Sequence, residues 1–509
     1  MITNIHKMLL KKGYFPDELG FWFVSEGLAD KFDQINNSVT LNKKLSSKPV
    51  KYSIPKGRYN RRTLSVPNPY HYFFLCKTIH DNWTEIQTHL EKSKISLTTP
   101  VFKTGSSRAI SRKYTFEDIS SMFLTRSVGA NYVLRTDISR YYSTIYTHSI
   151  PWALHSKSIA KLNNKDKLLG NFLDKLVRNS QDKQTIGIPV GPDTSLIISE
   201  IIGVAMDELI MKDVDCLNSM RYIDDYYFFY EKLADAEKTL ANIQKVLGEF
   251  ELELNKEKTK IYEMPQSIEP DWISQINNTS LDNNNIISFI SVTYSLIKNN
   301  PNEDVLGYSL AKLKKLTINK NNWSIVQAFI LNSILYDPNG MPLACSILSE
   351  YYHKKYGVDN DKVLKTVNNI IQKSLISNSE YEIVWALWLT HILNINLTDD
   401  MIKKLCNIDH PIIALILLGL YKNRRKLDTS VWEEHMVPDS LYNENWILAY
   451  EALMRGWLPP KTGKNYLDED DFFAALKKYN VSFFDSNCRT KWVSNYIDEK
   501  WLPIFSPAF

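Results

Sequence analysis

The sequence contains few cysteines and shows no paired cysteine spacing. Its 509 residues include five, and these are far apart: Cys76, Cys216, Cys345, Cys406 and Cys488. An odd number without close spacing argues against a disulfide framework and against a zinc site. We therefore expect a reducing compartment, the cytoplasm.

Long hydrophobic runs are also missing. One of the longest, PIIALILLGLY at residues 411–421, is too short to cross a bilayer. The N-terminus, MITNIHKMLLKKGYFPDELG, is interrupted by charge too early for a signal peptide. These two absences predict a protein with no membrane partner.

Acidic residues are absent from two stretches near the N-terminus, although the net charge of the whole chain is only +4. No Asp or Glu lies between Asp33 and Asp81 or between Glu91 and Glu117, and both stretches are rich in Lys and Arg. Such basic segments are typical of a surface that faces phosphate groups, and a solvated basic face is the alternative.

The pattern of elements divides the chain into four parts. Residues 1–130 are mixed, whereas residues 131–265 alternate between strand and helix signals. Residues 266–300 contain an Asn-rich stretch and are predicted to be a linker. Residues 301–509 consist of short amphipathic segments at a spacing of roughly 20 residues, which predicts an all-α helical-repeat half, a HEAT-like α-solenoid.

Two adjacent aspartates interrupt the apolar and aromatic stretch RYIDDYYFFY at residues 221–230. Asp224 and Asp225 fall at the predicted turn of a β-hairpin, and Asp137 ends a predicted strand in VLRTDI. Burying adjacent carboxylates is costly unless a cation or hydrogen-bond donors compensate. If the strands are neighbours, three carboxylates meet at one edge of a sheet and offer the oxygen ligands that Mg²⁺ prefers. A lone Asp-Asp pair is also common in solvated turns.

A glycine- and proline-rich loop, GIPVGPDTS at residues 187–195, precedes a long predicted helix. Glycines let backbone N–H groups approach a nucleotide closely, and a helix N-terminus favours anionic groups. The order strand–Asp, loop–helix, hairpin–Asp-Asp resembles the palm domain of reverse transcriptases. DISRYYSTI, GIPVGPDTS and YIDD match palm motifs, and ELNKEKTKI resembles the segment that follows them. RRTLSVPNP and SRAISRK resemble the fingers motifs.

This resemblance implies a fold and a set of roles. The fold class is an α+β right-hand polymerase with an N-terminal segment and fingers in residues 1–130 and the palm in residues 131–265, followed by the all-α half. Asp137, Asp224 and Asp225 are the implied catalytic metal ligands, with two Mg²⁺ ions, or Mn²⁺, as cofactors. Tyr142 matches the steric gate that favours dNTPs over NTPs. The other implied nucleotide contacts are Gly187, Pro189, Gly191, Arg61, Arg62, Arg108, Arg112 and Lys258.

The sequence departs from templated reverse transcriptases at two positions. Val190 and the pair Ser195-Leu196 stand where those enzymes usually carry a glutamine and Ser-Pro, and valine cannot hydrogen-bond around an incoming nucleotide. We see no RNase H-like acidic cluster and no maturase-like basic tail. With GYFPDEL at residues 13–19 and the helical second half, the sequence is similar to the abortive-infection (AbiK-like) reverse transcriptases of bacterial anti-phage defence.

That similarity implies template-independent DNA synthesis primed by a protein tyrosine, with the single-stranded DNA product attached to the protein. It also implies a homo-oligomer in the bacterial cytoplasm. Tyr14 is the predicted primer because GYFPDEL is expected on an exposed segment, although this motif also fits a segment packed on the fingers. Two alternatives stay open: a conventional RNA- or DNA-templated reverse transcriptase, and a helical-repeat interaction scaffold with an inactive palm. The three intact aspartates argue against the scaffold.

Overall fold

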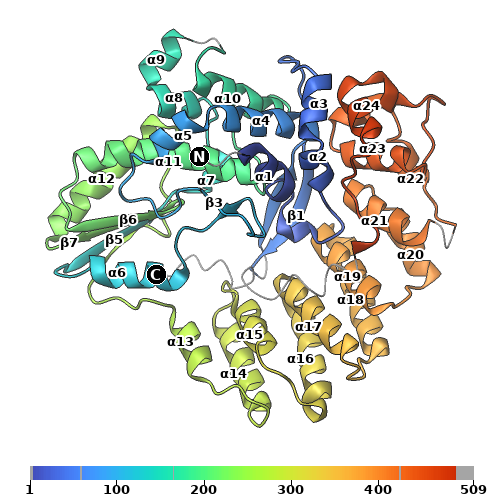
Figure 1. Ribbon diagram of the computed structural model, residues 1–509. Helices are drawn as coiled ribbons and strands as arrows, with labels where there is room; N and C mark the ends of the chain where they lie inside the picture. Colours follow the sequence, from blue (N-terminus) through green and yellow to red (C-terminus); the bar gives the residue numbers. More distant parts are fainter. Residues whose placement is uncertain (1–3, 58–59, 164–165, 423–425, 489–509) are drawn as a thin grey trace.

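The computed structural model describes residues 4–57, 60–163, 166–422 and 426–488. All named strands lie in the first part of this chain, and the described residues beyond Glu263 form helices joined by loops (Figure 1). The strands are β1 (Val50–Lys56), β2 (Asn60–Val66), β3 (Val101–Phe102), β4 (Ile110–Ser111), β5 (Tyr132–Asp137), β6 (Asn218–Tyr222), β7 (Asp225–Tyr230) and β8 (Lys260–Glu263).

The helices before β8 surround this sheet region and the N-terminal segment. They are α1 (Ile5–Lys12), α2 (Glu26–Asp30), α3 (Phe32–Ser38), α4 (Pro69–Asp81), α5 (Trp83–Leu90), α6 (Phe116–Arg126), α7 (Tyr141–Thr144), α8 (Ser149–His155), α9 (Lys157–Leu162), α10 (Leu169–Asn179), α11 (Asp193–Lys212) and α12 (Leu233–Glu249).

The helices after β8 complete the chain. They are α13 (Asp271–Asn278), α14 (Ile286–Asn299), α15 (Val305–Lys314), α16 (Trp323–Tyr336), α17 (Met341–His353), α18 (Asn360–Ser377), α19 (Glu380–Leu393), α20 (Asp399–Cys406), α21 (Pro411–Tyr421), α22 (Ser430–Glu433), α23 (Trp446–Met454) and α24 (Asp471–Lys478).

A four-stranded antiparallel sheet in the order β6-β7-β5-β8 forms the centre of the first half. The predicted strand at residues 131–138 and the predicted hairpin around Asp224 are confirmed, because β5 pairs with β7 and β7 pairs with β6. The long helix predicted after the glycine- and proline-rich loop is also confirmed, and it begins at Asp193, directly after Pro192.

The strand β7 is buried on both faces, which explains its uninterrupted aromatic sequence. Successive side chains of a strand point to opposite faces. Tyr226 and Phe228 join the main core on the side of α11 and α12, whereas Tyr227 and Phe229 join a second cluster with Phe123 of α6. The sheet is therefore covered by helices on both faces, and only its edges and strand ends are left for function.

The helical second half packs helix by helix. Contacts run in series from α15 to α17, α19, α21 and α23, and α16 and α18 lie beside this row. In Figure 1 the series starts beneath the sheet and ends beside α2 and α3, and α24 contacts α3. Residues 266–300 were expected to be a linker, but they form α13 and α14. The expectation was wrong because the Asn-rich stretch only fills the short turn between these two helices.

The two halves share one hydrophobic core. The N-terminal segment, α4 and the helices α15–α24 contribute to the same cluster of buried residues. Hydrogen bonds also cross between the halves: Trp385 Nε1 donates to the Glu18 carbonyl at 3.1 Å, and Asn68 Nδ2 donates to the Leu441 carbonyl at 2.7 Å. The position of the first half is thus fixed by the second.

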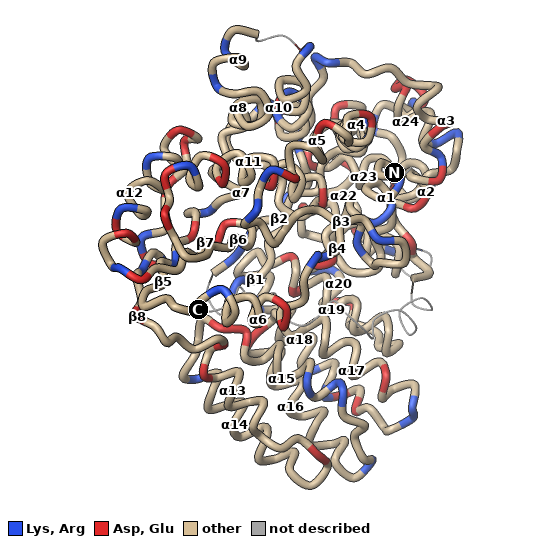
Figure 2. The backbone as a smooth tube through the Cα atoms, turned by 60° about the vertical axis from the view of Figure 1, so that its left-hand side comes forward, with Lys and Arg blue, Asp and Glu red and all other residues tan. Residues whose placement is uncertain are grey.

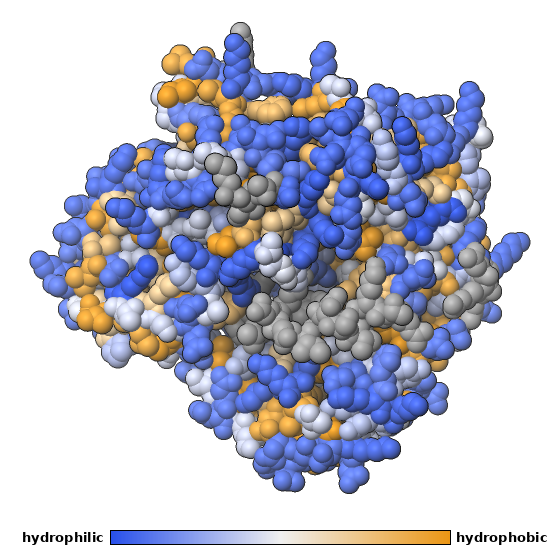
Figure 3. Space-filling view, viewed as in Figure 1, coloured by the Kyte–Doolittle hydropathy of each residue, from blue (hydrophilic) through white to orange (hydrophobic). Residues whose placement is uncertain are grey.

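The surface offers no extended apolar face in the view of Figure 3. Exposed apolar side chains include Ile159 and Leu162 on α9 and Ile287 on α14. The hydrophobic areas in Figure 3 are separated by hydrophilic ones. Among the described helices, none is long and apolar enough to span a membrane.

Candidate active site

The three aspartates meet at one end of the central strands. Asp137 is the last residue of β5, Asp225 is the first of β7, and the two are register partners. Asp224 lies in the turn before Asp225, and its carbonyl accepts a hydrogen bond from the Ile138 N–H (3.2 Å). Asp137 and Asp225 are each 4% exposed, and Asp224 is partly exposed. The sheet therefore brings the predicted carboxylates to one edge.

The carboxylates at this edge repel one another. Burial, followed by the charges of Asp225 and Asp137, raises the pKa of Asp224 to about 7. Lys258 Nζ donates to Asp137 Oδ2 at 2.8 Å, and Asn255 Nδ2 donates to Asp137 Oδ1 at 3.1 Å. Burial lowers the pKa of Lys258, but its hydrogen bond to Asp137 and the neighbouring carboxylates outweigh burial and raise it. One lysine thus neutralises the cluster only in part.

This donor set fits a divalent cation chemically. Carboxylate oxygens are ligands for Mg²⁺ and Mn²⁺, and a cation removes the repulsion that raises the pKa of Asp224. As the described side chains stand, no group of three or more His, Cys, Asp or Glu residues is close enough together to hold a metal ion. Asp137 is turned to Lys258 and Asn255 instead. A metal held by all three aspartates would therefore share Asp137 with Lys258 or compete with it for this carboxylate.

Tyr142 lies on α7, the short helix that follows β5. Its hydroxyl accepts a hydrogen bond from Ser199 Oγ of α11 (3.1 Å), and its carbonyl accepts one from the Ile188 N–H (2.8 Å). Burial raises the pKa of this hydroxyl, the hydrogen bond from Ser199 opposes the change, and the charge of Asp224 adds to it. Tyr142 is therefore held between α11 and the predicted loop, within electrostatic reach of Asp224.

The loop from Gly187 to Pro192 is fixed from three sides. Gly187 has a φ of +83°, and a Cβ there would lie 3.2 Å from the Ser143 carbonyl oxygen. Gly191 has a φ of +126°, and a Cβ there would meet Pro16 at 3.2 Å. The Val190 carbonyl accepts from the Ser65 N–H of β2 at 2.8 Å. Together with the buried Pro189, these contacts hold the loop rigidly between the paired strands β1 and β2, helix α7 and the N-terminal segment.

Arg61 and Arg62 were both expected to contact phosphate, and the structure separates them. Arg61 donates to both Glu382 oxygens of α19 (2.7 and 3.0 Å) and to the Ser53 hydroxyl and carbonyl (2.6 and 2.8 Å). Its donors therefore tie β1 and β2 to the helical half instead of facing the aspartates. Arg62 is exposed, and its charge acts on Tyr142 and on Lys56. Only Arg62 of the two lies toward the site.

Arg108 also has a structural partner. It forms an ion pair with Asp193, which is 2% exposed at the start of α11, and donates to the carbonyls of Phe15 (2.5 Å) and Gly191 (3.1 Å). Burial lowers the pKa of Arg108, but Asp193 and the other acidic neighbours raise it above the ordinary value. The expectation of a phosphate contact is not met here, because the carboxylate of Asp193 and the two carbonyls take up the guanidinium.

Arg112, a predicted nucleotide contact, is exposed. Its guanidinium lies 4.6 Å from the centre of the Phe116 ring, and its charge lowers the pKa of Tyr222, the first residue of the YIDD box, against the effect of burial. Arg112 is thus available near the hairpin that carries the aspartates.

Tyr14 is not exposed, and the prediction that it lies on an accessible segment was wrong. It is 0% exposed, and its hydroxyl donates to the Pro67 carbonyl at 2.6 Å. Its ring stacks on Phe15 (4.5 Å) and Tyr72 (4.3 Å). Burial raises the pKa of the Tyr14 hydroxyl well above its ordinary value. A hydroxyl in this position cannot reach a nucleotide at the aspartates.

Many cations of the two acid-free stretches pair with acids that lie far away in the sequence. Figure 2 shows basic and acidic positions interspersed around the sheet and along α12. The pairs that join these stretches to distant acids are Lys43–Asp166, Lys48–Glu444, Arg61–Glu382, Lys92–Glu208 and Arg108–Asp193. Many of the basic side chains in these two stretches therefore form ion pairs within the protein.

Sequence reasoning missed Lys56 and Asn255. Lys56 ends β1, and burial lowers its pKa, as do the charges of Arg62 and Lys258, whereas Asp137 and Asp224 raise it. Lys56 therefore lies in the same field as the carboxylates. The sequence feature that could have indicated Lys56 is its position in an acid-free stretch. Asn255 had no signal apart from its position in the segment ELNKEKTKI.

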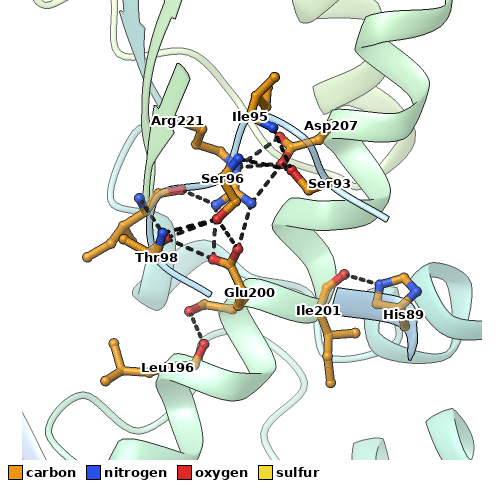
Figure 4. A network of polar contacts seen from close by, with 12 residues as sticks. His89, Ser93, Ile95, Ser96, Thr98, Leu196, Glu200, Ile201, Asp207 and Arg221 are labelled. Atoms are coloured by element: carbon orange, nitrogen blue, oxygen red, sulfur yellow. Dashed lines mark hydrogen bonds and ion pairs between the residues drawn. The ribbon is translucent and has the colours of Figure 1, made fainter. Parts of the chain in front are cut away.

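A buried polar network behind the hairpin was also missed (Figure 4). Arg221, at the start of the RYIDD stretch, pairs with Glu200 and Asp207 of α11, and all three side chains are at most 4% exposed. Burial opposes ionisation of Glu200, but Arg221 outweighs it and lowers the pKa of this carboxyl. Two acidic residues seven positions apart on an apolar helix were the sequence signal for this network.

Comparison with known families identifies the domain. A family model described as "Reverse transcriptase (RNA-dependent DNA polymerase)" matches residues 60–308, from β2 into α15. This span contains the three aspartates, Tyr142 and the Gly187–Pro192 loop. Residues 60–308 therefore carry a reverse transcriptase domain, and such a domain indicates a nucleotidyltransferase, a reverse transcriptase-like DNA polymerase. No curated protein matches the chain.

Solved structures with some similarity include three telomerase structures. Apo telomerase from Candida tropicalis, truncated from its C-terminal domain, is 14% identical with a TM-score of 0.32, and the match covers 45% of this chain and 52% of that one. Telomerase from Candida albicans in complex with a fragment of telomeric RNA is 13% identical (TM-score 0.31; 74% and 66% covered). Apo telomerase from C. tropicalis is 12% identical (TM-score 0.31; 70% and 66% covered). The chain thus spans about half to two thirds of these proteins.

Proposed function

We propose that this chain is a Mg²⁺-dependent DNA polymerase that uses dNTPs, with Asp137, Asp224 and Asp225 as the metal ligands. The observation that carries the proposal is the register pairing of Asp137 with Asp225, beside an Asp224 whose pKa is raised by burial and then by both of these charges. Three mutually repelling carboxylates at a strand end are stabilised by divalent cations. When bound, such ions would activate a hydroxyl nucleophile and stabilise the leaving pyrophosphate.

The chain's own residues bind and orient the nucleotide in this proposal. Positive charge near the aspartates comes from Lys56, Arg62 and Lys258, and these three side chains bind the triphosphate. The Tyr142 ring, held by Ser199 and the Gly187–Pro192 loop, supports the sugar and excludes a 2′-hydroxyl. Arg61 and Arg108 do not contact the nucleotide in this proposal. Arg61 holds the paired strands β1 and β2 in place, and Arg108 holds the Gly187–Pro192 loop.

We further propose that synthesis needs no template, starts on a protein hydroxyl and serves abortive-infection defence against phage. Val190 supports this part, since its side chain offers no hydrogen bond to a base or sugar. The similarity at GYFPDEL and in the helical half supports it too. A covalently attached single-stranded DNA product and a homo-oligomer follow from the same similarity, and the helix-by-helix packing of α15–α23 supports a HEAT-like array. With Tyr14 buried, the primer is another hydroxyl of the chain.

The test uses the purified full chain, Mg²⁺ and one labelled dNTP at a time, without primer or template. We expect label that remains with the polypeptide on a denaturing gel and is released by protease. The Asp224→Asn variant should lose at least about a hundredfold in incorporation, because the site loses a metal ligand that contributes several kcal/mol of transition-state stabilisation. Mass spectrometry of the labelled peptide would then identify the primer.

The matched control is Asp215→Asn, an exposed aspartate in the segment that leads into the same hairpin. It removes a carboxylate from the same region without touching the strand end, so we expect incorporation to match the unaltered chain. Retained synthesis in Asp224→Asn, with normal folding by circular dichroism, would refute the assignment of the metal ligands.

A conventional templated reverse transcriptase is the second candidate. The description of the matching family, an RNA-dependent DNA polymerase, favours it. In this case incorporation appears only when an annealed primer and template are added, and the product follows the template in composition. The roles of the three aspartates are the same in both candidates.

A further inference from the structure

The turn that carries Asp224 is strained. Tyr222 and Asp225 are paired, so Ile223 and Asp224 form a two-residue hairpin loop. Ile223 has a φ of +58°, and Asp224 is not among the residues with positive φ. This pattern belongs to a type II′ turn, in which glycine normally takes the first central position. A β-branched residue adopts such a φ only where its surroundings hold it there.

Arg221 holds the carbonyl of Ile223. It is fully buried in β6, and its Nη1 donates to the Ile223 carbonyl at 2.9 Å. The other donors go to two carboxylates: Nε and Nη2 to Asp207 at 2.8 Å each, and Nη1 and Nη2 to Glu200 at 3.1 and 2.9 Å. All five N–H groups of the guanidinium are therefore engaged, and its orientation is fixed.

Helix α11 is shaped to receive this guanidinium. Glu200, Gly203 and Asp207 lie on one face of the helix, at positions i, i+3 and i+7. A Cβ at Gly203 would lie 2.8 Å from Arg221 Nη1, so the glycine leaves the room that the guanidinium occupies. The long helix thus presents two carboxylates to Arg221 (Figure 4), and Gly203 between them leaves room for the guanidinium.

Thr98 binds the other side of Ile223. Its Oγ1 accepts a hydrogen bond from the Ile223 N–H at 3.3 Å and donates to Glu200 Oε2 at 3.0 Å. Both polar backbone groups of the strained residue are therefore bonded to the same network. Figure 4 shows Thr98, Glu200, Arg221 and Asp207 joined by a continuous set of contacts.

We propose that Arg221, fixed by Glu200 and Asp207 and assisted by Thr98, is a positioning residue that keeps Ile223 in its left-handed conformation. It thereby holds Asp224 and Asp225 against Asp137. The contacts of Arg221 and Thr98 with Ile223 are called the clamp below. The role of the clamp in the reaction rests on the proposed function. The conformation of the turn, however, is a property of the fold and can be measured without catalysis.

The test combines Thr98→Val with Ile223→Gly. Valine has nearly the shape of threonine but forms neither bond of Thr98, so we expect kcat to fall about tenfold and KM for dNTP to change by less than about twofold. Glycine adopts the turn conformation without a steric penalty, so it does not need the clamp. We therefore expect the double variant to have the kcat of Ile223→Gly alone.

The matched control is Thr293→Val in the helical half, where a buried threonine bonds to Ser309 at 3.2 Å. It removes a buried hydroxyl of the same kind far from the hairpin. We expect a loss of thermal stability similar to that of Thr98→Val and an unchanged kcat. If Thr98 only stabilises the fold, Thr98→Val should behave like Thr293→Val, with lower thermal stability and an unchanged kcat, and Ile223→Gly should rescue nothing.

Hydrogen exchange of the metal-free chain provides a second readout that does not depend on polymerase activity. The Ile138 N–H donates to the Asp224 carbonyl, so its exchange reports on the turn. Thr98→Val should raise exchange at Ile138 about tenfold, and Ile223→Gly should restore protection. An inactive chain that shows this pattern would refute the proposed function and keep the clamp. Unchanged exchange in Thr98→Val, or no rescue in either readout, would overturn the clamp.

Discussion

Arg61 and Arg62 are neighbours on β2, and we expect their removal to have different consequences. Successive side chains on a strand point to opposite faces. Arg61 pairs with Glu382 of the helical half, whereas Arg62 acts on Tyr142 and Lys56 near the aspartates. Arg61→Ala should therefore lower stability, and Arg62→Ala should weaken nucleotide binding.

The magnitude follows from burial. The Glu382 side chain is 8% exposed, and breaking a fully buried ion pair costs about 3–5 kcal/mol because one charge is left unpaired. The Arg61 side chain is 31% exposed, and water partly screens the pair, so we expect Arg61→Ala to lower the free energy of unfolding by about 2 kcal/mol. Removing Glu382 as well should restore part of this loss, because the second partner no longer lies unpaired.

Arg62→Ala should change stability by less than about 0.5 kcal/mol, as expected of an exposed residue. It should raise KM for dNTP about tenfold, the effect of losing one charged hydrogen bond to phosphate. Urea denaturation of the full chain measures the first quantity for Arg61→Ala, Glu382→Ala, the double variant and Arg62→Ala. Steady-state incorporation measures the second.

The reasoning would be refuted if Arg61→Ala raised KM as much as Arg62→Ala and left stability unchanged. Arg61 would then contact the nucleotide, as the fingers motif implies. A loss of stability in the double variant equal to the sum of the two single losses would show instead that the ion pair contributes nothing across the two halves.

Two further predictions concern single residues. Tyr142→Ala should admit ribonucleotides while Tyr142→Phe keeps the preference for dNTPs, and unchanged discrimination in the alanine variant would remove Tyr142 from this role. Burial, followed by the charge of Asp337, raises the pKa of Asp304 to about 7, so the contribution of Asp304 to stability is lost as pH rises from about 4 to 7. Asp304→Asn retains the acceptor for the Gly307 N–H, so it should be more stable by about 2 kcal/mol at pH 8 and equal at pH 4 in thermal unfolding.

Local patterns predicted the centre of the fold well. The strand before Asp137, the hairpin around Asp224 and the helix from Asp193 each carry their signal within a few residues, and antiparallel pairing then places the aspartates together. The same patterns could not predict where long cationic side chains go. The partner of Arg61 lies 321 residues away, and that of Arg108 lies 85 residues away.

The linker prediction failed for a related reason. Asparagine-rich composition marks a turn, and a turn is present between α13 and α14, but composition does not show whether the flanking helices pack. They do pack: α13 contacts α14 and α15, and Trp272, Phe289 and Val305 form a core cluster of their own.

The burial of Tyr14 has the same kind of cause as the pairing of the cationic side chains and the packing of α13 and α14. The segment around Tyr14 has the polar and aromatic mixture of an exposed motif, yet Trp446 and Phe483 of the helical half complete the aromatic cluster around its ring, at 6.5 and 6.2 Å. A contact made by residues more than 400 positions away leaves no trace in the local sequence. The aromatic residues at the end of the helical half therefore enclose the N-terminal segment. If synthesis starts on a protein hydroxyl, as proposed, that hydroxyl has to belong to a residue outside this shared core that can approach Asp137 and Asp225.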